Sequence, residues 1–206
     1  MIKNQKLSAA RALRLPTIAE AMVDSLVTPS TVTSALTRGA LVVFGSLLLA
    51  VSAQFKIPLY PVPVTGQTLV VLLIGMTYGP RLGGITMLAY LFEGALGLPV
   101  FAGGAAGVAV FMGPTGGYLF GFLLAGVAMG YLAERGMGRT VSSTIAAMVL
   151  GNSVIYLCGV LWLANFIGLG QAIAEGVLPF LYGDALKLAV AAGLMPLAWR
   201  AVKSMK

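Results

Sequence analysis

Six long stretches of this chain carry almost no charge, and most are long enough to cross a lipid bilayer as helices. A transmembrane helix needs about 20 residues, at about 1.5 Å each, to cross about 30 Å of hydrocarbon. Of the 206 residues, 59% are hydrophobic and only 9% are charged. This pattern overrides the soluble domains that the length alone would suggest, and it predicts an all-α membrane protein.

The apolar stretches define one expected bundle. Between the first two stretches, Pro58, Pro61 and Pro63 stop any helix. The second stretch is short, and short or broken membrane helices often border a binding cavity. We expect a cytosolic arm over residues 1–34, with a surface helix near 16–26, and a single six-helix transmembrane domain over residues 35–206. The six spans are expected at residues 35–54, 65–78, 81–98, 114–133, 141–166 and 179–202.

The basic residues are distributed unevenly between the two sides of this expected bundle. Of 13 Lys and Arg residues, eleven fall on one side, only Lys56 falls on the other, and Lys187 lies within a span. Cytoplasmic loops carry such an excess, so both termini are expected in the cytoplasm. The same asymmetry explains the net charge of +7, and we expect no nucleic-acid partner because no basic patch is interleaved with aromatic residues. The eleven are Lys3, Lys6, Arg11, Arg14, Arg38, Arg81, Arg135, Arg139, Arg200, Lys203 and Lys206.

Two opposite charges, Asp184 and Lys187, interrupt the sixth span. A charged group at the centre of a bilayer costs about 2.5–3.5 kcal/mol on insertion scales. Residues three apart share a helix face, so the two side chains are expected to lie together. They are interpreted either as an internal salt bridge or, as intramembrane charges generally suggest, as a recognition pair for a polar solute.

A glycine-rich segment follows the third span. From Gly94 to Gly121, 9 of 28 residues are glycine, and the segment is apolar. Glycine permits positive φ and close backbone approach, and non-helical backbone is tolerated at membrane depth where it lines a cavity. We expect a re-entrant outer loop that offers peptide groups, including those of Gly103 and Gly104, to a ligand. The alternative is close helix packing through small residues.

Other polar side chains within the spans are weaker candidates for ligand binding. Asn152 and Tyr156 lie four residues apart on one helix face, and Glu93 lies near the outer end of the third span. Gln67 begins the second span and Tyr118 follows a glycine pair. Each alone is more often a packing hydrogen bond than a ligand contact.

Catalysis, metal binding and a resident cofactor are not expected. The chain has no histidine, which excludes Ser-His-Asp chemistry and most zinc sites. No phosphate-binding Gly-x-x-x-x-Gly-Lys-Ser/Thr motif is present, so the chain itself is not expected to hydrolyse ATP.

Three segments in this order resemble the BioY family, the biotin-binding S components of energy-coupling factor (ECF) transporters. They are Pro-Leu-Tyr-Pro-Val-Pro-Val-Thr-Gly-Gln-Thr at residues 58–68, Gly-Leu-Pro-Val-Phe-Ala-Gly-Gly at 97–104 with Gly-Pro-Thr-Gly-Gly-Tyr at 113–118, and Pro-Phe-Leu-Tyr-Gly-Asp-Ala-Leu-Lys at 179–187. The resemblance implies the six-helix S-component fold and biotin bound near the outer face. It also implies a bacterial cytoplasmic (inner) membrane location. Transport would be energised by a separate ECF transmembrane coupling subunit and two ATPase subunits.

The resemblance also assigns roles to residues. It matches Asp184 and Lys187 to the family's polar pair, Gln67 to its first-loop glutamine and Tyr118 to its Gly-Gly-Tyr tyrosine, and Phe101 is expected to pack on the ligand's rings. This sequence has Ala105 and Leu119 where some relatives carry polar and basic side chains. Small residues of the first span, Gly39, Ser46 and Ala50, match the family's docking surface, although Arg38 and Phe44 interrupt it.

Three other functions compete with this interpretation. An S component for a different vitamin differs only in the ligand that it binds, and a stand-alone biotin facilitator would transport without an ATPase partner. An intramembrane enzyme that uses Asp184 or Glu93 as an acid or base would convert its ligand, whereas a binder returns it unchanged.

Overall fold

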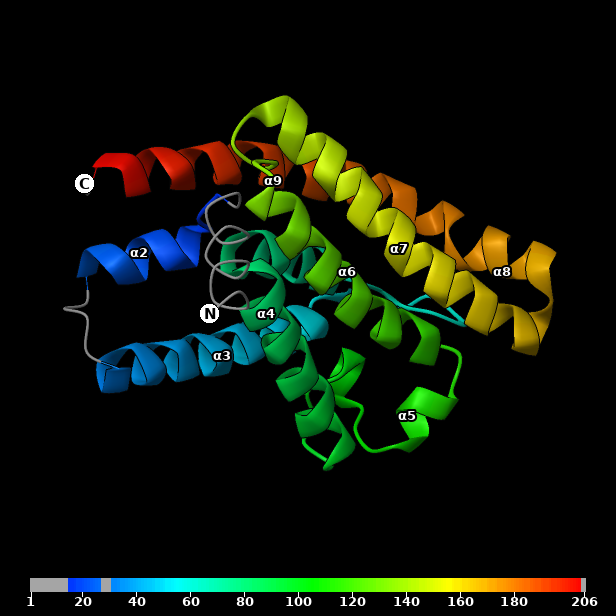
Figure 1. Cartoon of the computed structure of the whole chain (residues 1–206). Coiled ribbons are helices and arrows are strands. Elements are labelled where there is room, and N and C mark those ends of the chain that lie inside the picture. Colours follow the sequence, from blue (N-terminus) through cyan, green and yellow to red (C-terminus); the bar gives the residue numbers. More distant parts are fainter. Residues whose placement is uncertain (1–14, 27–30, 205–206) are drawn as a thin grey trace, which may run out of the picture.

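The chain is almost entirely helical, as the apolar stretches predict. The computed structural model describes residues 15–26 and 31–204, and five of its helical segments are long and apolar enough to cross a membrane. The elements pack into one bundle (Figure 1). In chain order they are α2 (Ile18–Leu26), α3 (Thr31–Gln54), β1 (Lys56–Ile57), β2 (Val64–Thr65), α4 (Gln67–Ala95), η1 (Ala102–Gly104), α5 (Ala109–Met112), α6 (Gly116–Glu134), α7 (Val141–Ile167), α8 (Leu169–Gly176) and α9 (Leu178–Ser204).

The second and third predicted spans form one broken element, α4, so the predicted count of six separate spans is not confirmed. The break falls at Gly79, whose φ of 81° and ψ of 175° are not helical. That region of backbone space is essentially restricted to glycine, and Pro80 adds a residue with no backbone N–H to donate. Gly130 of α6 faces the break, where a Cβ would collide with the backbone of Pro80.

A small hairpin joins α3 to α4. The prolines of this connection predicted only the absence of a helix. β1 and β2 pair antiparallel, with Lys56 opposite Thr65 and Ile57 opposite Val64. The Gly66 N–H donates to the Phe55 carbonyl at 3.0 Å, which extends the connection. The hairpin thereby fixes the start of α4.

The glycine-rich segment after α4 folds as short helical turns around one buried aromatic ring. Phe101 is 2% exposed and lies against Gly94, where a Cβ would collide with the ring. Its ring meets those of Tyr90 and Phe111 edge-on, with both pairs of centroids 5.5 Å apart. Gly94 therefore serves close packing, whereas other glycines here adopt the positive φ that a loop requires. The latter are Gly97, Gly103, Gly104 and Gly107. A re-entrant position of this segment remains a prediction.

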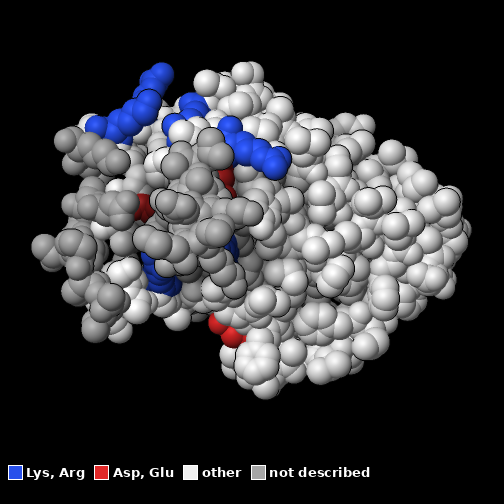
Figure 2. Space-filling view, in the orientation of Figure 1, with Lys and Arg blue, Asp and Glu red and all other residues white. Residues whose placement is uncertain are grey.

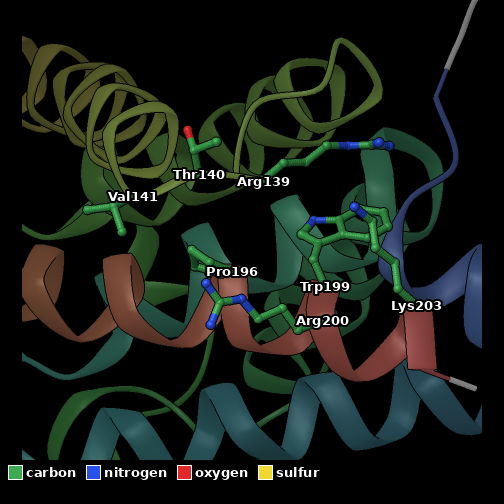
Figure 3. Close-up of a pocket in the computed structure, with 7 residues that line it drawn as sticks. All are labelled: Arg139, Thr140, Val141, Pro196, Trp199, Arg200 and Lys203. Carbon is green, nitrogen blue, oxygen red and sulfur yellow. The ribbon is translucent and has the colours of Figure 1, made fainter.

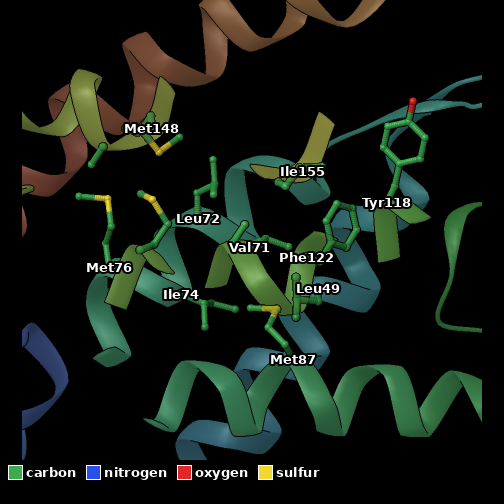
Figure 4. Packing of buried hydrophobic residues seen from close by; sticks show 14 of the residues in the cluster. Leu49, Val71, Leu72, Ile74, Met76, Met87, Tyr118, Phe122, Met148 and Ile155 are labelled. Atoms are coloured by element: carbon green, nitrogen blue, oxygen red, sulfur yellow. The ribbon is translucent and has the colours of Figure 1, made fainter. Parts of the chain in front are cut away.

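The core lies where α4, α6 and α7 pack together. Figure 4 shows large side chains from these helices and from α3 meeting there, among them Leu72, Met87, Phe122 and Ile155. In the apolar windows of α4 and α6, 56% and 61% of the residues are buried, against 17% for α3. Because lipid tails are as apolar as leucine, the exposed face of α3 is suited to lipid.

Part of the predicted N-terminal arm packs on the bundle. A helix was predicted near residues 16–26, and α2 occupies Ile18–Leu26 with Ile18 and Ala21 buried. The Leu15 N–H donates to the Glu134 carbonyl at 2.9 Å, so this stretch is fastened to the end of α6 rather than free on the surface. Of the rest of the predicted arm, residues 31–34 begin α3, while residues 1–14 and 27–30 lie outside the described residues. The boundary at residue 34 remains a prediction.

Lys and Arg side chains cluster toward one end of the molecule. Figure 2 shows them near the C-terminal end of α9, while the opposite half of that face is uncharged. This arrangement fits the asymmetry read from the sequence. The side of the membrane on which that end lies remains a prediction.

The break at Gly79 generates a stability prediction. Gly79→Ala is expected to lower the free energy of unfolding by about 1–3 kcal/mol, because a non-glycine residue is strained in this conformation and the new Cβ would lie 2.9 Å from Thr17 Cγ2. Gly39→Ala is the matched control, since nothing lies within 4 Å of a Cβ there. Thermal unfolding in detergent measures both, and equal midpoints for the two variants would contradict the strain at Gly79.

Candidate functional site

The predicted pair on α9 is the centre of a buried polar cluster. Lys187 Nζ lies 3.1 Å from Asp184 Oδ1 and donates to Thr68 Oγ1 of α4 at 2.7 Å. The Tyr156 hydroxyl of α7 donates to the other Asp184 oxygen, Oδ2. Three helices thus supply one site, and Asp184 is 5% exposed there. The prediction that Asp184 and Lys187 lie together is confirmed.

Both charges retain capacity for further hydrogen bonds. A carboxylate can accept about four hydrogen bonds and an ammonium can donate three, and the cluster uses only part of each. Taking two charges out of water is costly, so a buried pair is weak support for stability by itself. Chemically, the cluster offers an acceptor and a cation a few ångströms apart, which suits a solute with both N–H groups and a carbonyl or carboxylate.

Aromatic rings from α6, α7 and α9 extend the cluster. Phe180 meets the Tyr156 ring at 6.2 Å between centroids and 73° between planes. On its other side it stacks on Tyr118, with centroids 6.3 Å apart and planes 13° apart. The Tyr118 hydroxyl donates to the Gly176 carbonyl at 2.9 Å. The predicted site residue Tyr118 therefore reaches the cluster through Phe180, while a backbone carbonyl occupies its hydroxyl.

Gln67, the predicted first-loop ligand, is engaged in a structural network. Its amide donates to the Tyr90 hydroxyl at 2.7 Å, and its Oε1 accepts from Thr65 at 3.2 Å. Tyr90 in turn donates to the Val100 carbonyl at 2.9 Å. Gln67 and Tyr90 lie on opposite sides of the break at Gly79. The network therefore joins both halves of α4 to the hairpin and to the segment that holds Phe101.

The remaining predicted residues lie outside these contacts. Asn152 is 7% exposed and lies one turn before Tyr156, and its Oδ1 has no hydrogen-bond partner within the described part of the chain. Glu93 is half-buried, and no hydrogen bond or ion pair joins its side chain to the described residues. Gly103 and Gly104 are exposed, and the Lys56 side chain lies over Gly103. Within the part of the chain that the structure describes, no hydrogen bond or ion pair links Glu93 or the two glycines to Asp184.

Three residues that the sequence reasoning did not single out are central here: Thr68, Tyr90 and Phe180. Thr68 and Phe180 lie inside the segments that carried the resemblance, directly after Gln67 and Pro179. Their position next to Gln67 and Pro179 was the sequence feature that could have identified them. Tyr90 had no signal beyond being a tyrosine within an apolar span.

Comparison with known proteins places the chain in a family. The sequence model of the BioY family matches residues 22–204. The chain belongs to the BioY family. It is 44% identical over 144 residues to the "Probable biotin transporter BioY" of Pyrococcus horikoshii, an alignment that covers 70% of this chain and 85% of that protein. It is 40% identical over 161 residues to the "Biotin transporter BioY" of Rhizobium etli, which covers 74% and 84%.

A solved structure shares the fold. The crystal structure of "the S-component for biotin from an ECF-type ABC transporter" superposes with a TM-score of 0.75 at 24% identity, covering 84% of this chain and 95% of that one. The predicted BioY resemblance and the predicted all-α membrane fold are thereby confirmed. The BioY chain is a multi-pass membrane protein, and its family comprises transport proteins rather than enzymes.

The Gln67 network generates a second prediction. Tyr90→Phe is expected to lower the free energy of unfolding by about 1–3 kcal/mol, because it leaves the Gln67 amide and the Val100 carbonyl buried without their partner. Tyr78→Phe is the control, since the Tyr78 hydroxyl makes no hydrogen bond to any described residue. Thermal unfolding of both variants in detergent gives the comparison. A Tyr90→Phe variant as stable as the control would show that the network contributes nothing to stability.

Proposed function

We propose that this BioY protein is an integral membrane subunit that binds biotin and mediates its uptake. The observation that carries the proposal is the buried Asp184–Lys187 pair, held by Thr68 and Tyr156 within a family whose curated relatives are named as biotin transporters. A mostly apolar site with a few convergent polar groups is the usual arrangement for a small ligand.

The ligand's chemistry complements the cluster. Biotin carries a ureido group with two N–H donors and a carbonyl, an apolar bicyclic body and a carboxylate on a flexible tail. Asp184 accepts from the ureido N–H groups, and Lys187 meets a carbonyl or carboxylate oxygen. Ligand atoms take up the hydrogen-bonding capacity that Thr68 and Tyr156 leave free on the two charges.

Rings and backbone complete the proposed site. Phe180 and Tyr118 continue from the polar pair as an apolar wall against which the bicyclic body packs. Gly103 and Gly104 contribute backbone groups. Phe101, which was expected to pack on the ligand's rings, is instead buried against Gly94, Tyr90 and Phe111, and in this proposal it holds their segment in place. Asn152 lies one turn from Tyr156, and because its amide oxygen has no partner among the described residues, it is a further acceptor. For Glu93, only its position near the outer end of α4 supports a role as a ligand residue.

The energy for uptake comes from other subunits. The sequence has no phosphate-binding loop of its own. We therefore infer a separate ECF transmembrane coupling subunit with ATPase subunits as partners. The distribution of Lys and Arg supports cytoplasmic termini, and the family resemblance supports a location in the bacterial inner membrane.

Equilibrium binding of labelled biotin to the detergent-purified chain tests the ligand. Saturable binding that dethiobiotin displaces and an unrelated vitamin does not is the expected result. Displacement by the unrelated vitamin instead would favour an S component for a different vitamin. Failure of the folded protein to bind biotin would refute the assignment.

The polar pair should matter for binding more than for folding. Asp184→Asn and Lys187→Met are each expected to weaken biotin binding by about 30-fold or more, because losing one partner of a buried charge pair costs about 2–5 kcal/mol. Membrane expression should change far less. Glu134→Gln and Arg135→Met at the far end of α6 are matched controls and should bind as the parent does. Equal losses of binding and expression would identify the pair as a structural salt bridge.

Uptake should depend on the coupling module. In proteoliposomes, labelled biotin is expected to accumulate only when the coupling and ATPase subunits are present together with ATP. Accumulation by this chain alone would identify a stand-alone facilitator.

A further inference from the structure

A cavity lies where α7 begins and α9 ends, apart from the Asp184 cluster. It has a volume of about 320 Å³. Lys187 and Trp199 are twelve residues apart on α9, which separates the cavity from the polar pair by about 18 Å along the helix. Figure 3 shows the side chains that enclose it. They are Arg139, Thr140, Val141, Pro196, Trp199, Arg200 and Lys203.

The cavity is strongly basic. Three of its seven lining residues are cations, and none is a carboxylate. An accumulation of Lys and Arg at one end of the bundle is ordinary for a membrane protein and does not by itself indicate a binding site. What distinguishes these three is that they line one cavity from two parts of the chain, the connection between α6 and α7 and the last turns of α9.

Arg139 is positioned by the fold. Its guanidinium carbon lies 4.4 Å from the ring centroid of Trp199, which is 7% exposed and belongs to the core. One terminal nitrogen donates to the Pro16 carbonyl at 3.4 Å. The Nε atom, however, is buried and has no acceptor among the described residues. Buried donors are normally paired, so an incoming oxygen atom would complete this group.

The other residues that line the cavity suit a lipid headgroup. Arg200 and Lys203 are exposed on the last turns of α9, and Figure 3 shows Lys203 beside the Trp199 ring. Val141 and Pro196 supply an apolar edge, with Val141 54% exposed. Basic pockets between membrane helices bind anionic headgroups, and tryptophan is enriched at headgroup depth. A guanidinium fork also suits phosphate oxygens.

We propose that Arg139, Arg200 and Lys203, with Trp199, form a binding site for the phosphate group of an anionic phospholipid. The lipid's acyl chains run along the exposed apolar side near Val141, and its phosphate accepts a hydrogen bond from the Arg139 Nε–H, which has no acceptor among the described residues. The bound lipid fastens the end of α9 to the start of α7, independently of biotin.

Native mass spectrometry of the full chain in a neutral detergent tests this site, with phosphatidylglycerol, phosphatidylcholine and glycerol phosphate as probes. We expect phosphatidylglycerol to be retained in preference to phosphatidylcholine and to raise the unfolding temperature. Glycerol phosphate should do neither. Equal retention of both lipids would indicate adventitious binding only and would overturn the proposal. So would equal binding of glycerol phosphate, which would identify a site for free phosphate.

Two sets of variants separate a built site from general attraction. The Arg200→Gln/Lys203→Gln double variant should weaken phosphatidylglycerol binding about 25-fold, taking about fivefold for each cation lost near the surface. Arg38→Gln/Arg135→Gln removes two exposed cations outside the cavity and should change binding by less than about twofold. Arg139→Lys keeps the charge but loses the planar fork, and about a fivefold loss is expected.

Retained biotin binding in each variant establishes that it is folded. Equal weakening by the two double variants would overturn the proposal in favour of diffuse electrostatic attraction. An Arg139→Lys variant that binds the lipid as the parent does would remove Arg139 from the site.

Discussion

Two opposite charges on one turn of α9 can stay inside this apolar bundle only because neighbouring helices supply their hydrogen-bond partners. Thr68 of α4 accepts from Lys187, and Tyr156 of α7 donates to Asp184. Losing either partner would leave a buried charge short of the bonds that offset its removal from water. The relative placement of α4, α7 and α9 is therefore tied to the electrostatics of one pair. The same α7 and α9 carry Tyr156 and Phe180, the aromatic residues nearest to it.

The break in α4 allows the hydrogen bond between Gln67 and Tyr90, and this bond in turn bears on the position of Thr68, the partner of Lys187. A straight helix from Gln67 to Ala95 would set Gln67 and Tyr90 about 35 Å apart along its axis. With Gly79 non-helical, their side chains instead bond directly at 2.7 Å. This contact fixes the start of α4, and Thr68 is the next residue along. The partner of Lys187 thus depends indirectly on a backbone conformation eleven residues away.

Hydropathy and spacing predicted much of this architecture because they report the cost of exposing polar backbone and charge to lipid. The predicted sixth span at 179–202 nearly coincides with α9 at Leu178–Ser204, and the spacing of Asp184 and Lys187 predicted their shared face. The contact between Lys187 and Thr68 spans 119 residues, and no local pattern encodes it. Membrane helices are apolar on every face, so periodicity does not reveal which faces meet. For the same reason, Gln67 was identified as important while its actual partner, Tyr90, was not.

The shallow burial of α3 has a thermodynamic consequence. Its exposed side, with Phe44 57% and Val51 56% accessible, meets hydrocarbon in a membrane. Replacing lipid tails there with another apolar helix changes the surrounding medium very little, so the exchange carries almost no hydrophobic driving force. Contacts along α3 are therefore nearly isoenergetic with solvation by lipid. They can form and release repeatedly without disturbing the core built by α4, α6 and α7.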